Sequence, residues 1–135
     1  MSGNNTIIHT WFEEVWNQGK EATIDRLMAP TAVYHGMPDG KDIRGPAEFK
    51  PFWRKFRGAF PNMKFTVVEC VVQGDRLAAR CQVSGTHSGD HLGVPATNRP
   101  VSFEGMVLAH LKNGQIAEGW NFFDLLSMNK QLGLM

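Results

Sequence analysis

The 135-residue sequence lacks the features that define several large classes of protein. No apolar run approaches the ~18 residues that a membrane-spanning helix needs. The formal net charge is +1 and no basic run is present, which argues against nucleic acid as the main partner. The first five residues have neither the basic nor the apolar region of a signal peptide, so we expect a cytoplasmic protein with no membrane partner.

The common motifs of cofactor, metal and nucleophile chemistry are also missing. There is no HExxH, no paired CxxC, no P-loop, no GxGxxG and no serine or cysteine nucleophile signature. His87, Asp90 and His91 are residue types that can bind zinc, but Gly89 and Gly93 break the segment, so no helix enforces a ligand spacing. We therefore expect no metal and no cofactor. The segment is better interpreted as a loop over the mouth of a pocket, with His87 as a candidate ligand contact.

Only two cysteines occur, Cys70 and Cys81, on two runs that we expect to pair around a turn at 74–75. Pairing about that turn places Cys70 opposite position 78 and Cys81 opposite position 67. A disulfide between them is therefore not expected, and both are interpreted as small core residues of a protein in a reducing compartment.

Length and composition describe a single domain over residues 1–135, with 42% hydrophobic and 20% charged residues. In the first half, apolar residues three and four apart predict helices. After position 63 the pattern becomes strand-like, and Asn113-Gly114 is a strong hairpin signal. The predicted helices are 8–19, 22–28, 46–60 and 125–132, and the predicted strands are 32–35, 64–72, 76–85, 101–112 and 115–123, with a loop at 36–45. This order predicts an α+β domain with helices on one face of a curved antiparallel sheet.

The last quarter of the chain is its most informative part. A strand rich in aromatic residues runs directly into the final predicted helix, and a single carboxylate, Asp124, stands at the junction. The position of Asp124 has two interpretations. It is a suitable N-cap for the helix, and an acid held among aromatic rings is suited to general acid/base catalysis near neutral pH. The two roles are compatible, because a capping residue can also line a pocket.

Several motifs, spread in register over nearly the whole chain, resemble the SnoaL-like polyketide cyclase family, also called the ester cyclase family, within the NTF2-like fold. The motifs are Trp11-Phe-Glu-Glu-Val-Trp-Asn-Gln-Gly19, Tyr34-His-Gly36, Phe56-Arg-Gly-Ala-Phe-Pro61, Gly85-Thr-His87, Gly93-Val-Pro95, Glu118-Gly-Trp120 and the stretch from Asp124 to Gly133. The resemblance is specific for fold and family and less so for reaction, because one fold hosts many chemistries.

The resemblance implies a closed cone, with a strongly bent sheet wrapped around a pocket. The cyclases of this family close a ring by intramolecular aldol condensation of a polyketide methyl ester without cofactor or metal. One pocket aspartate abstracts the proton alpha to the ester and later protonates the new alkoxide. Asp124 matches that aspartate. His110, across the hairpin from the last strand, is a second catalytic candidate that corresponds either to a pocket histidine of the cyclases or to an exposed position on the strand. Gly119 departs from the histidine that many members carry before the tryptophan.

The expected pocket lining is apolar and aromatic, which suits a flat hydrophobic or aromatic substrate. Tyr34 and His35 are neighbours on a strand, so alternation sends them to opposite faces and one of the two should face the cavity. Residues at helical spacing in the longest helix serve as core, as pocket wall or as both. The candidate substrate-binding residues are Tyr34, His35, Phe52, Trp53, Phe56, His87, Met106, Trp120 and Phe122.

Two classes of function remain open at this point. The first is a cofactor-independent cyclase or isomerase with Asp124 as the acid/base. The second is a non-catalytic protein that holds a hydrophobic metabolite in the same pocket. A hydrolase or dehydratase of the same fold is a further alternative, but such enzymes usually need more acids than this sequence offers. We also expect a homodimer that pairs through the outer face of the sheet.

Overall fold

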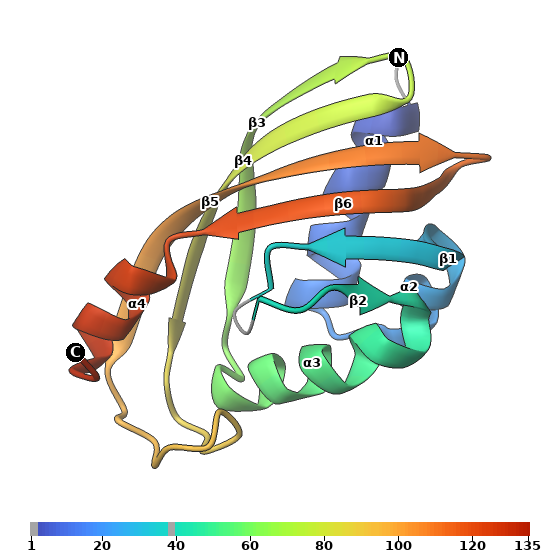
Figure 1. The fold of residues 1–135 in the computed structure, drawn as a ribbon. Helices are drawn as coiled ribbons and strands as arrows, with labels where there is room; N and C mark the ends of the chain where they lie inside the picture. The colour runs from blue at the N-terminus through green and yellow to red at the C-terminus, as the bar shows by residue number, and fades with distance from the viewer. Residues whose placement is uncertain (1–2, 38–39) are drawn as a thin grey trace.

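The computed structural model describes residues 3–37 and 40–135 (Figure 1). Pro38 and Asp39, within the predicted loop 36–45, lie outside the described residues. The elements follow in the order α1 (Gly3–Thr10), η1 (Trp11–Asn17), α2 (Glu21–Leu27), β1 (Met28–His35), β2 (Ile43–Arg44), α3 (Gly45–Ala59), β3 (Lys64–Gln73), β4 (Arg76–Thr86), β5 (Pro100–Lys112), β6 (Gln115–Phe123) and α4 (Leu125–Leu132). The predicted α+β class is confirmed. No helix within the described ranges is both long enough and apolar enough to cross a membrane.

The strands form one curved sheet in the order β2-β1-β6-β5-β4-β3. The last four strands are an antiparallel meander, as predicted. The Asn113-Gly114 turn has positive φ at both residues, 54° and 75°, which matches the twist of a two-residue hairpin. In contrast, β1 runs parallel to β6. The sheet is open rather than a closed cone, because β2 and β3 are its two edges.

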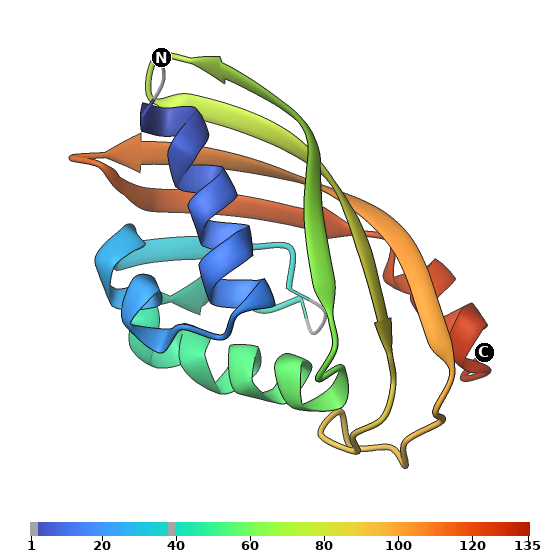
Figure 2. The same ribbon diagram turned by 180° about the vertical axis from the view of Figure 1, so that it is seen from behind.

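The helices cover the concave face of the sheet. Figures 1 and 2 show α1 crossing this face and α3 lying along one side of it, while α4 sits at the far end against β5. The predicted first helix is two segments, α1 and the π-helical η1. Trp11, Phe12, Val15 and Trp16 are all buried in η1. Between them, the sheet and the helices enclose the core that also holds the pocket.

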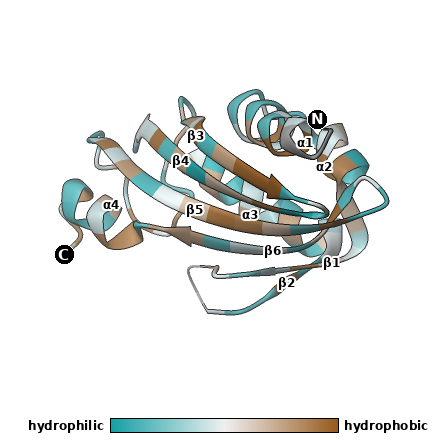
Figure 3. Cartoon of the chain, turned by 90° about the horizontal axis from the view of Figure 1, so that it is seen from above, coloured by the Kyte–Doolittle hydropathy of each residue, from teal (hydrophilic) through white to brown (hydrophobic). Residues whose placement is uncertain are grey.

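Two β-bulges within the meander β3–β6 change which side chains face the helices. Between β3 and β4, the register shifts at Val68, so Cys70 lies opposite Ala79, while Cys81 lies opposite Val67 as predicted. Between β5 and β6, His110 pairs with Glu118 and Leu111 with Ile116, which leaves one extra residue in β6. An extra residue reverses the alternation of side chains beyond it. Figure 3 shows both apolar and polar stretches along the strands.

Candidate functional site

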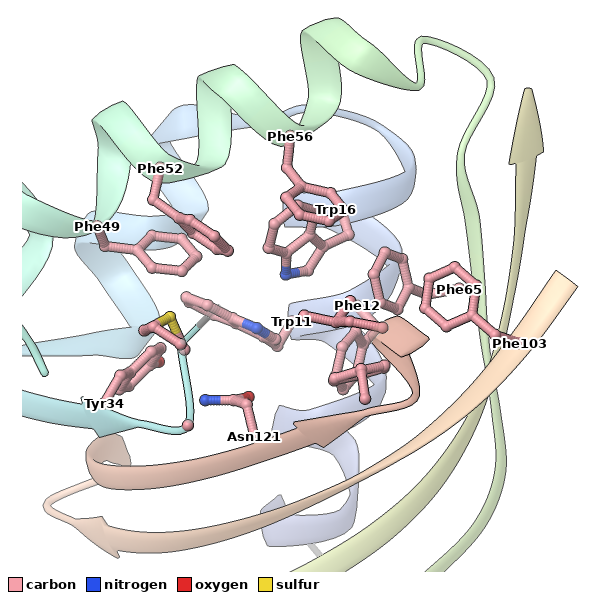
Figure 4. Close-up of a pocket in the computed structure, with 14 residues that line it drawn as sticks. Trp11, Phe12, Trp16, Tyr34, Phe49, Phe52, Phe56, Phe65, Phe103 and Asn121 are labelled. Atoms are coloured by element: carbon pink, nitrogen blue, oxygen red, sulfur yellow. The ribbon is translucent and has the colours of Figure 1, made fainter. Parts of the chain in front are cut away.

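A cavity lies between the helical layer and the concave face of the sheet. The region within it that the centre of a water molecule can reach has a volume of about 70 Å³. About 10–15 Å³ measured in this way holds one water molecule, so the cavity has room for several. Most of its walls are aromatic rings, which Figure 4 shows turned toward a common centre. The lining residues are Trp11, Phe12, Trp16, Tyr34, Gly36, Met37, Phe49, Phe52, Phe56, Phe65, Phe103, Asn121, Phe123 and Leu125.

The helical wall of the cavity comes from η1 and α3. The π-helical hydrogen bonds of η1 run from residue i to residue i+5. Residues five apart therefore lie one turn apart on the same face, and Trp11 and Trp16 both line the cavity. The side of α3 that faces them contributes three more rings at helical spacing, which are Phe49, Phe52 and Phe56.

Phe49 stands at the centre of this aromatic wall. It is 2% exposed, and its ring centroid lies 5.3 Å from that of Trp11 and 5.5 Å from that of Tyr34. Trp16 and Phe52 follow at 6.0 Å and 6.1 Å. Aromatic pairs at such distances contribute about 0.5–1.5 kcal/mol each beyond the area they bury. The wall is therefore held together by the same rings that define the cavity.

The sheet wall is set by alternation along β6. Asn121 and Phe123 line the cavity, while Phe122 between them points outward and is 66% exposed. Gly105 of β5 is the cross-strand partner of Phe123. A Cβ at position 105 would overlap the Phe123 ring, so the glycine allows that ring to lie flat over the β5 backbone.

The polar groups of the lining are few. The Tyr34 hydroxyl is buried and has no hydrogen-bond partner among the described residues. Asn121 donates from Nδ2 to the backbone carbonyl of His35 at 3.3 Å. The end of β1 can approach Asn121 this closely because Gly36 has a φ of 82° and any Cβ there would overlap the Asn121 carbonyl. No carboxylate and no imidazole belongs to the lining within the described ranges.

Asp124 lies at the rim of the cavity rather than in its wall. Its side chain is exposed and accepts a hydrogen bond from the Ser127 amide at 3.0 Å, which caps α4. Its two neighbours in the chain, Phe123 and Leu125, both line the cavity. The structure therefore contains the predicted cap, and the acid/base role stays a prediction.

His35, His110 and Trp120 meet on the opposite face of the sheet from the cavity. The Trp120 ring stacks on His35 at 5.2 Å and meets His110 edge-on at 4.8 Å. His35 also contacts Glu118 at 2.7 Å and Asp42 at 3.0 Å. These two carboxylates raise the pKa of His35 above its ordinary value, and the hydrogen bond with Glu118 has the larger effect. Alternation on β1 thus sends Tyr34 to the cavity and His35 away from it. His110 also lies on the face away from the cavity and is not part of its lining, which agrees with the second of the two alternatives for this residue.

The remaining predicted contacts divide between the pocket and other surroundings. Phe52 and Phe56 line the cavity, and their contact with a ligand stays a prediction. Met106 is 52% exposed on the outer face. Trp53 is buried behind the wall, where its indole nitrogen donates to the Val15 carbonyl at 2.8 Å.

His87 is fully buried against Phe60 rather than placed over a pocket mouth. The Thr97 amide donates to its Nδ1 at 3.2 Å, and this contact ties the two ends of the 88–96 segment together. The described residues bring together no group of three or more His, Cys, Asp or Glu side chains able to hold a metal ion. His91 instead packs on Gly58 beside a shallow surface depression.

The comparisons with known proteins agree on one family. The family model described as SnoaL-like polyketide cyclase matches residues 6–132. The chain belongs to the SnoaL-like polyketide cyclase family. It is 27% identical over 126 residues to aklanonic acid methyl ester cyclase DnrD of Streptomyces peucetius, covering 89% of this chain and 84% of that one. The same enzyme of Streptomyces sp. strain C5, DauD, is also 27% identical, with 76% of its length covered.

Solved structures give the same result. Wild-type IdmH of Streptomyces antibioticus, a candidate polyketide cyclase, superposes with a TM-score of 0.83 at 33% identity, covering 96% of this chain and 98% of that one. A SnoaL-like protein of Jannaschia sp. CCS1 reaches a TM-score of 0.87 at 23% identity, covering 98% and 93%, which supports the fold alone. The predicted family is therefore confirmed, and membership supports a small molecule as substrate.

Several cavity residues of this family member are absent from the predicted lining. The helical stripe of the first segment was visible in the sequence, and it could have indicated Trp11 and Trp16 as pocket residues as well as core. The bulge in β6 at residues 116–118 contains no glycine or proline. The sequence therefore carries no sign that Asn121 and Phe123 face the cavity. The lining residues that are not among the candidate substrate-binding residues are Trp11, Phe12, Trp16, Gly36, Met37, Phe49, Phe65, Phe103, Asn121, Phe123 and Leu125.

The buried tyrosine makes the fold sensitive to alkali. Burial raises the pKa of Tyr34 above its ordinary value, so the folded state keeps a proton that an unfolded tyrosine loses above pH ~10. The contribution of Tyr34 to the free energy of unfolding is complete below that pH. It is lost as the pH rises beyond it, at about 1.4 kcal/mol per pH unit. We expect the unfolding free energy of the Tyr34→Phe variant to decline less steeply between pH 10 and 11 in urea titrations.

A background decline remains in both proteins, because burial also raises the pKa of Cys81 to about 12. Parallel stability curves for the wild type and the Tyr34→Phe variant would contradict the prediction.

Proposed function

We propose that this protein binds a flat aromatic polyketide in the cavity and closes one of its rings by an intramolecular aldol reaction. The observation that carries the proposal is a cavity walled by aromatic rings, in a chain of the polyketide cyclase family. Such walls suit a planar, largely apolar ligand. The matched relatives act on aklanonic acid methyl ester, as their names state, and the chain spans most of their length.

In the proposed reaction, Asp124 is the acid/base. Its carboxylate takes the proton alpha to the ester, and the resulting enolate carbon attacks a ketone carbon of the same molecule. One carbon–carbon bond forms, the ketone oxygen becomes an alkoxide, and Asp124 returns the proton to that oxygen. The product is an isomer of the substrate, so the step needs no oxidant or reductant. Proton transfer by a positioned side chain typically contributes about 10²- to 10⁴-fold in rate.

The position of Asp124 sets a condition on this reaction. Phe123 and Leu125 on either side of it line the cavity, so a ligand bound there comes within reach of the rim. The carboxylate contacts Ser127 by one oxygen, which leaves the other for the substrate. The reacting end of the ligand must therefore face the rim, with its ring system held among the aromatic residues.

One observation favours a second candidate, a protein that binds a polyketide without converting it. The part of the cavity wall that the structure describes contains no acid and no base. In that case Asp124 acts only as the cap of α4.

Aklanonic acid methyl ester distinguishes the two candidates. We expect the protein to convert it to a product of identical mass and altered chromatographic retention, and to bind it with quenching of tryptophan fluorescence. The Phe52→Ala variant, altered in the cavity wall, should lose about tenfold or more in affinity, because burying an aromatic ring contributes several kcal/mol. The matched Phe122→Ala variant, altered on the outer face, should bind normally. Quenching without product would favour the binding protein, and no binding would refute both candidates.

A further inference from the structure

The sequence contains a single tyrosine, Tyr34. Its hydroxyl oxygen and the Nε2 atom of His87 are the two buried side-chain atoms of the described residues that have no hydrogen-bond partner. Tyr34 is 4% exposed and lines the cavity from β1. Within the described part of the chain no group pairs with its hydroxyl. A buried hydroxyl without a partner has lost its hydrogen bonds to water and gained none in return, which is unfavourable for folding. Phenylalanine, which forms most of the surrounding wall, would fill the same space without this penalty.

The ring of Tyr34 is held in place on three sides. It meets Trp11 and Phe49 edge-on, at centroid distances of 6.0 Å and 5.5 Å. On the sheet side it packs on Gly119, where an added Cβ would already lie 3.4 Å from its Cδ1 atom. Because the ring cannot swing away, the hydroxyl has a preset position, as a hydrogen-bond donor for recognition requires. Figure 4 shows Tyr34 at the edge of the cavity opposite the rings of α3.

The chemistry of the wall restricts the partner of this hydroxyl. Burial raises the pKa of Tyr34, so the group stays a neutral O–H donor. No lysine, arginine or histidine lines the described part of the cavity, so a bound carboxylate or phosphate would lose its hydration without gaining a countercharge. A carbonyl oxygen is a neutral acceptor that is less costly to desolvate. It can also gain negative charge during enolate chemistry, when a preset donor stabilises it most.

We infer that Tyr34 is a specificity-determining residue, whose hydroxyl donates a hydrogen bond to a neutral carbonyl oxygen of the ligand. The residue makes the cavity prefer planar ketones over hydrocarbons of the same shape. The inference rests on the part of the proposed function that places a ligand in this cavity, and it does not depend on ring closure.

A matched pair of probes tests the inference. 1-Tetralone and tetralin have nearly the same shape, and only the ketone carries a carbonyl group. Affinities for the wild type and the variant are measured by quenching of tryptophan fluorescence. In the wild type, a label at the Cζ atom of tyrosine also gives one NMR signal, because Tyr34 is the only tyrosine. For the wild type we expect 1-tetralone to shift that signal and tetralin to leave it nearly unchanged. The Tyr34→Phe variant should bind 1-tetralone about 3- to 10-fold more weakly, with tetralin affinity equal or higher.

The stability of the variants separates a recognition role from a structural one. We expect Tyr34→Phe to melt at the same temperature as the wild type or higher, since it removes an unpaired buried group. The control is Thr23→Val, which removes another buried hydroxyl, one that donates to Glu14 at 2.7 Å away from the cavity. That variant should melt at a lower temperature and bind both probes normally.

The outcomes separate the inference from the proposed function. Two results would overturn the carbonyl contact and leave the cavity as a ligand site. The first is an equal loss of affinity for both probes in Tyr34→Phe. The second is a lowered melting temperature of that variant with unchanged affinity for 1-tetralone. Failure of both probes and of aklanonic acid methyl ester to bind the wild type overturns the inference together with the proposed function.

Discussion

Replacing Asp124 with asparagine is expected to lower the rate of ring closure by about 10²- to 10⁴-fold, the usual contribution of a general acid/base. Asparagine keeps the shape of the side chain and an oxygen that accepts from the Ser127 amide, but it cannot take up the substrate proton. Because asparagine caps helices about as well as aspartate, the free energy of unfolding should change by less than about 1 kcal/mol. Initial rates with aklanonic acid methyl ester and urea unfolding measure the two effects.

The Asp124→Ala variant is the control that separates the cap from the catalyst. It removes both the proton acceptor and the bond to Ser127, so it should lose activity and also about 0.5–2 kcal/mol of stability. A third variant, Ser127→Ala, leaves the 127 amide and thus the cap in place, and it should keep both properties. If Asp124→Asn turned the ester over at the wild-type rate, Asp124 would be only a cap, and the proton acceptor would have to be sought elsewhere.

Local signals in the sequence were sufficient for most of the elements. The final helix has the predicted bounds, 125–132, because Asp124 caps its start and Gly133, with a φ of 78°, ends it. The Asn113-Gly114 hairpin is equally local. By contrast, β1 begins at Met28, four residues before the predicted strand, because pairing of Met28 with Ile116 extends it. That pairing is tertiary and leaves no local signature.

The faces of the strands were harder to predict than their bounds. Counting by twos from the buried Ile116 points Trp120 and Phe122 inward, yet both face away from the cavity. The bulge after Ile116 adds one residue and reverses the alternation, and this brings Asn121 to the cavity. The irregularity arises where the strands pair, so no residue type predicts it.

The outward position of Met106 was within reach of the sequence. Ser102 and Glu104 precede it at intervals of two, and polar residues at that spacing indicate the solvent-facing side of a strand. The sequence alone does not show that Tyr34, rather than His35, faces the cavity, because alternation shows only that the two residues face opposite ways. His35 contacts two carboxylates on the outer face, and one of them, Glu118, is 83 residues away in the sequence.

The largest loss of stability is expected for Phe49→Ala. Phe49 is 2% exposed and lies at the centre of the aromatic wall, in ring contact with Trp11, Trp16, Tyr34 and Phe52. Removing its ring enlarges the cavity and takes these contacts from four neighbours. Buried Phe→Ala substitutions cost about 3–5 kcal/mol, against a total stability of about 5–15 kcal/mol for a domain of this kind. Urea unfolding at neutral pH measures the loss.

Phe122→Ala is the matched control for that experiment, because it makes the same chemical change on the outer face of β6. Phe122 is 66% exposed, and surface substitutions usually stay within about 0.5 kcal/mol. We therefore expect a difference of at least 2–3 kcal/mol between the two variants. A loss at Phe122 as large as that at Phe49 would mean that the outer face is covered in solution. A loss at Phe49 below about 1 kcal/mol would contradict the packing of the aromatic wall, since a ring with four ring neighbours cannot be removed from a close-packed core at so small a cost.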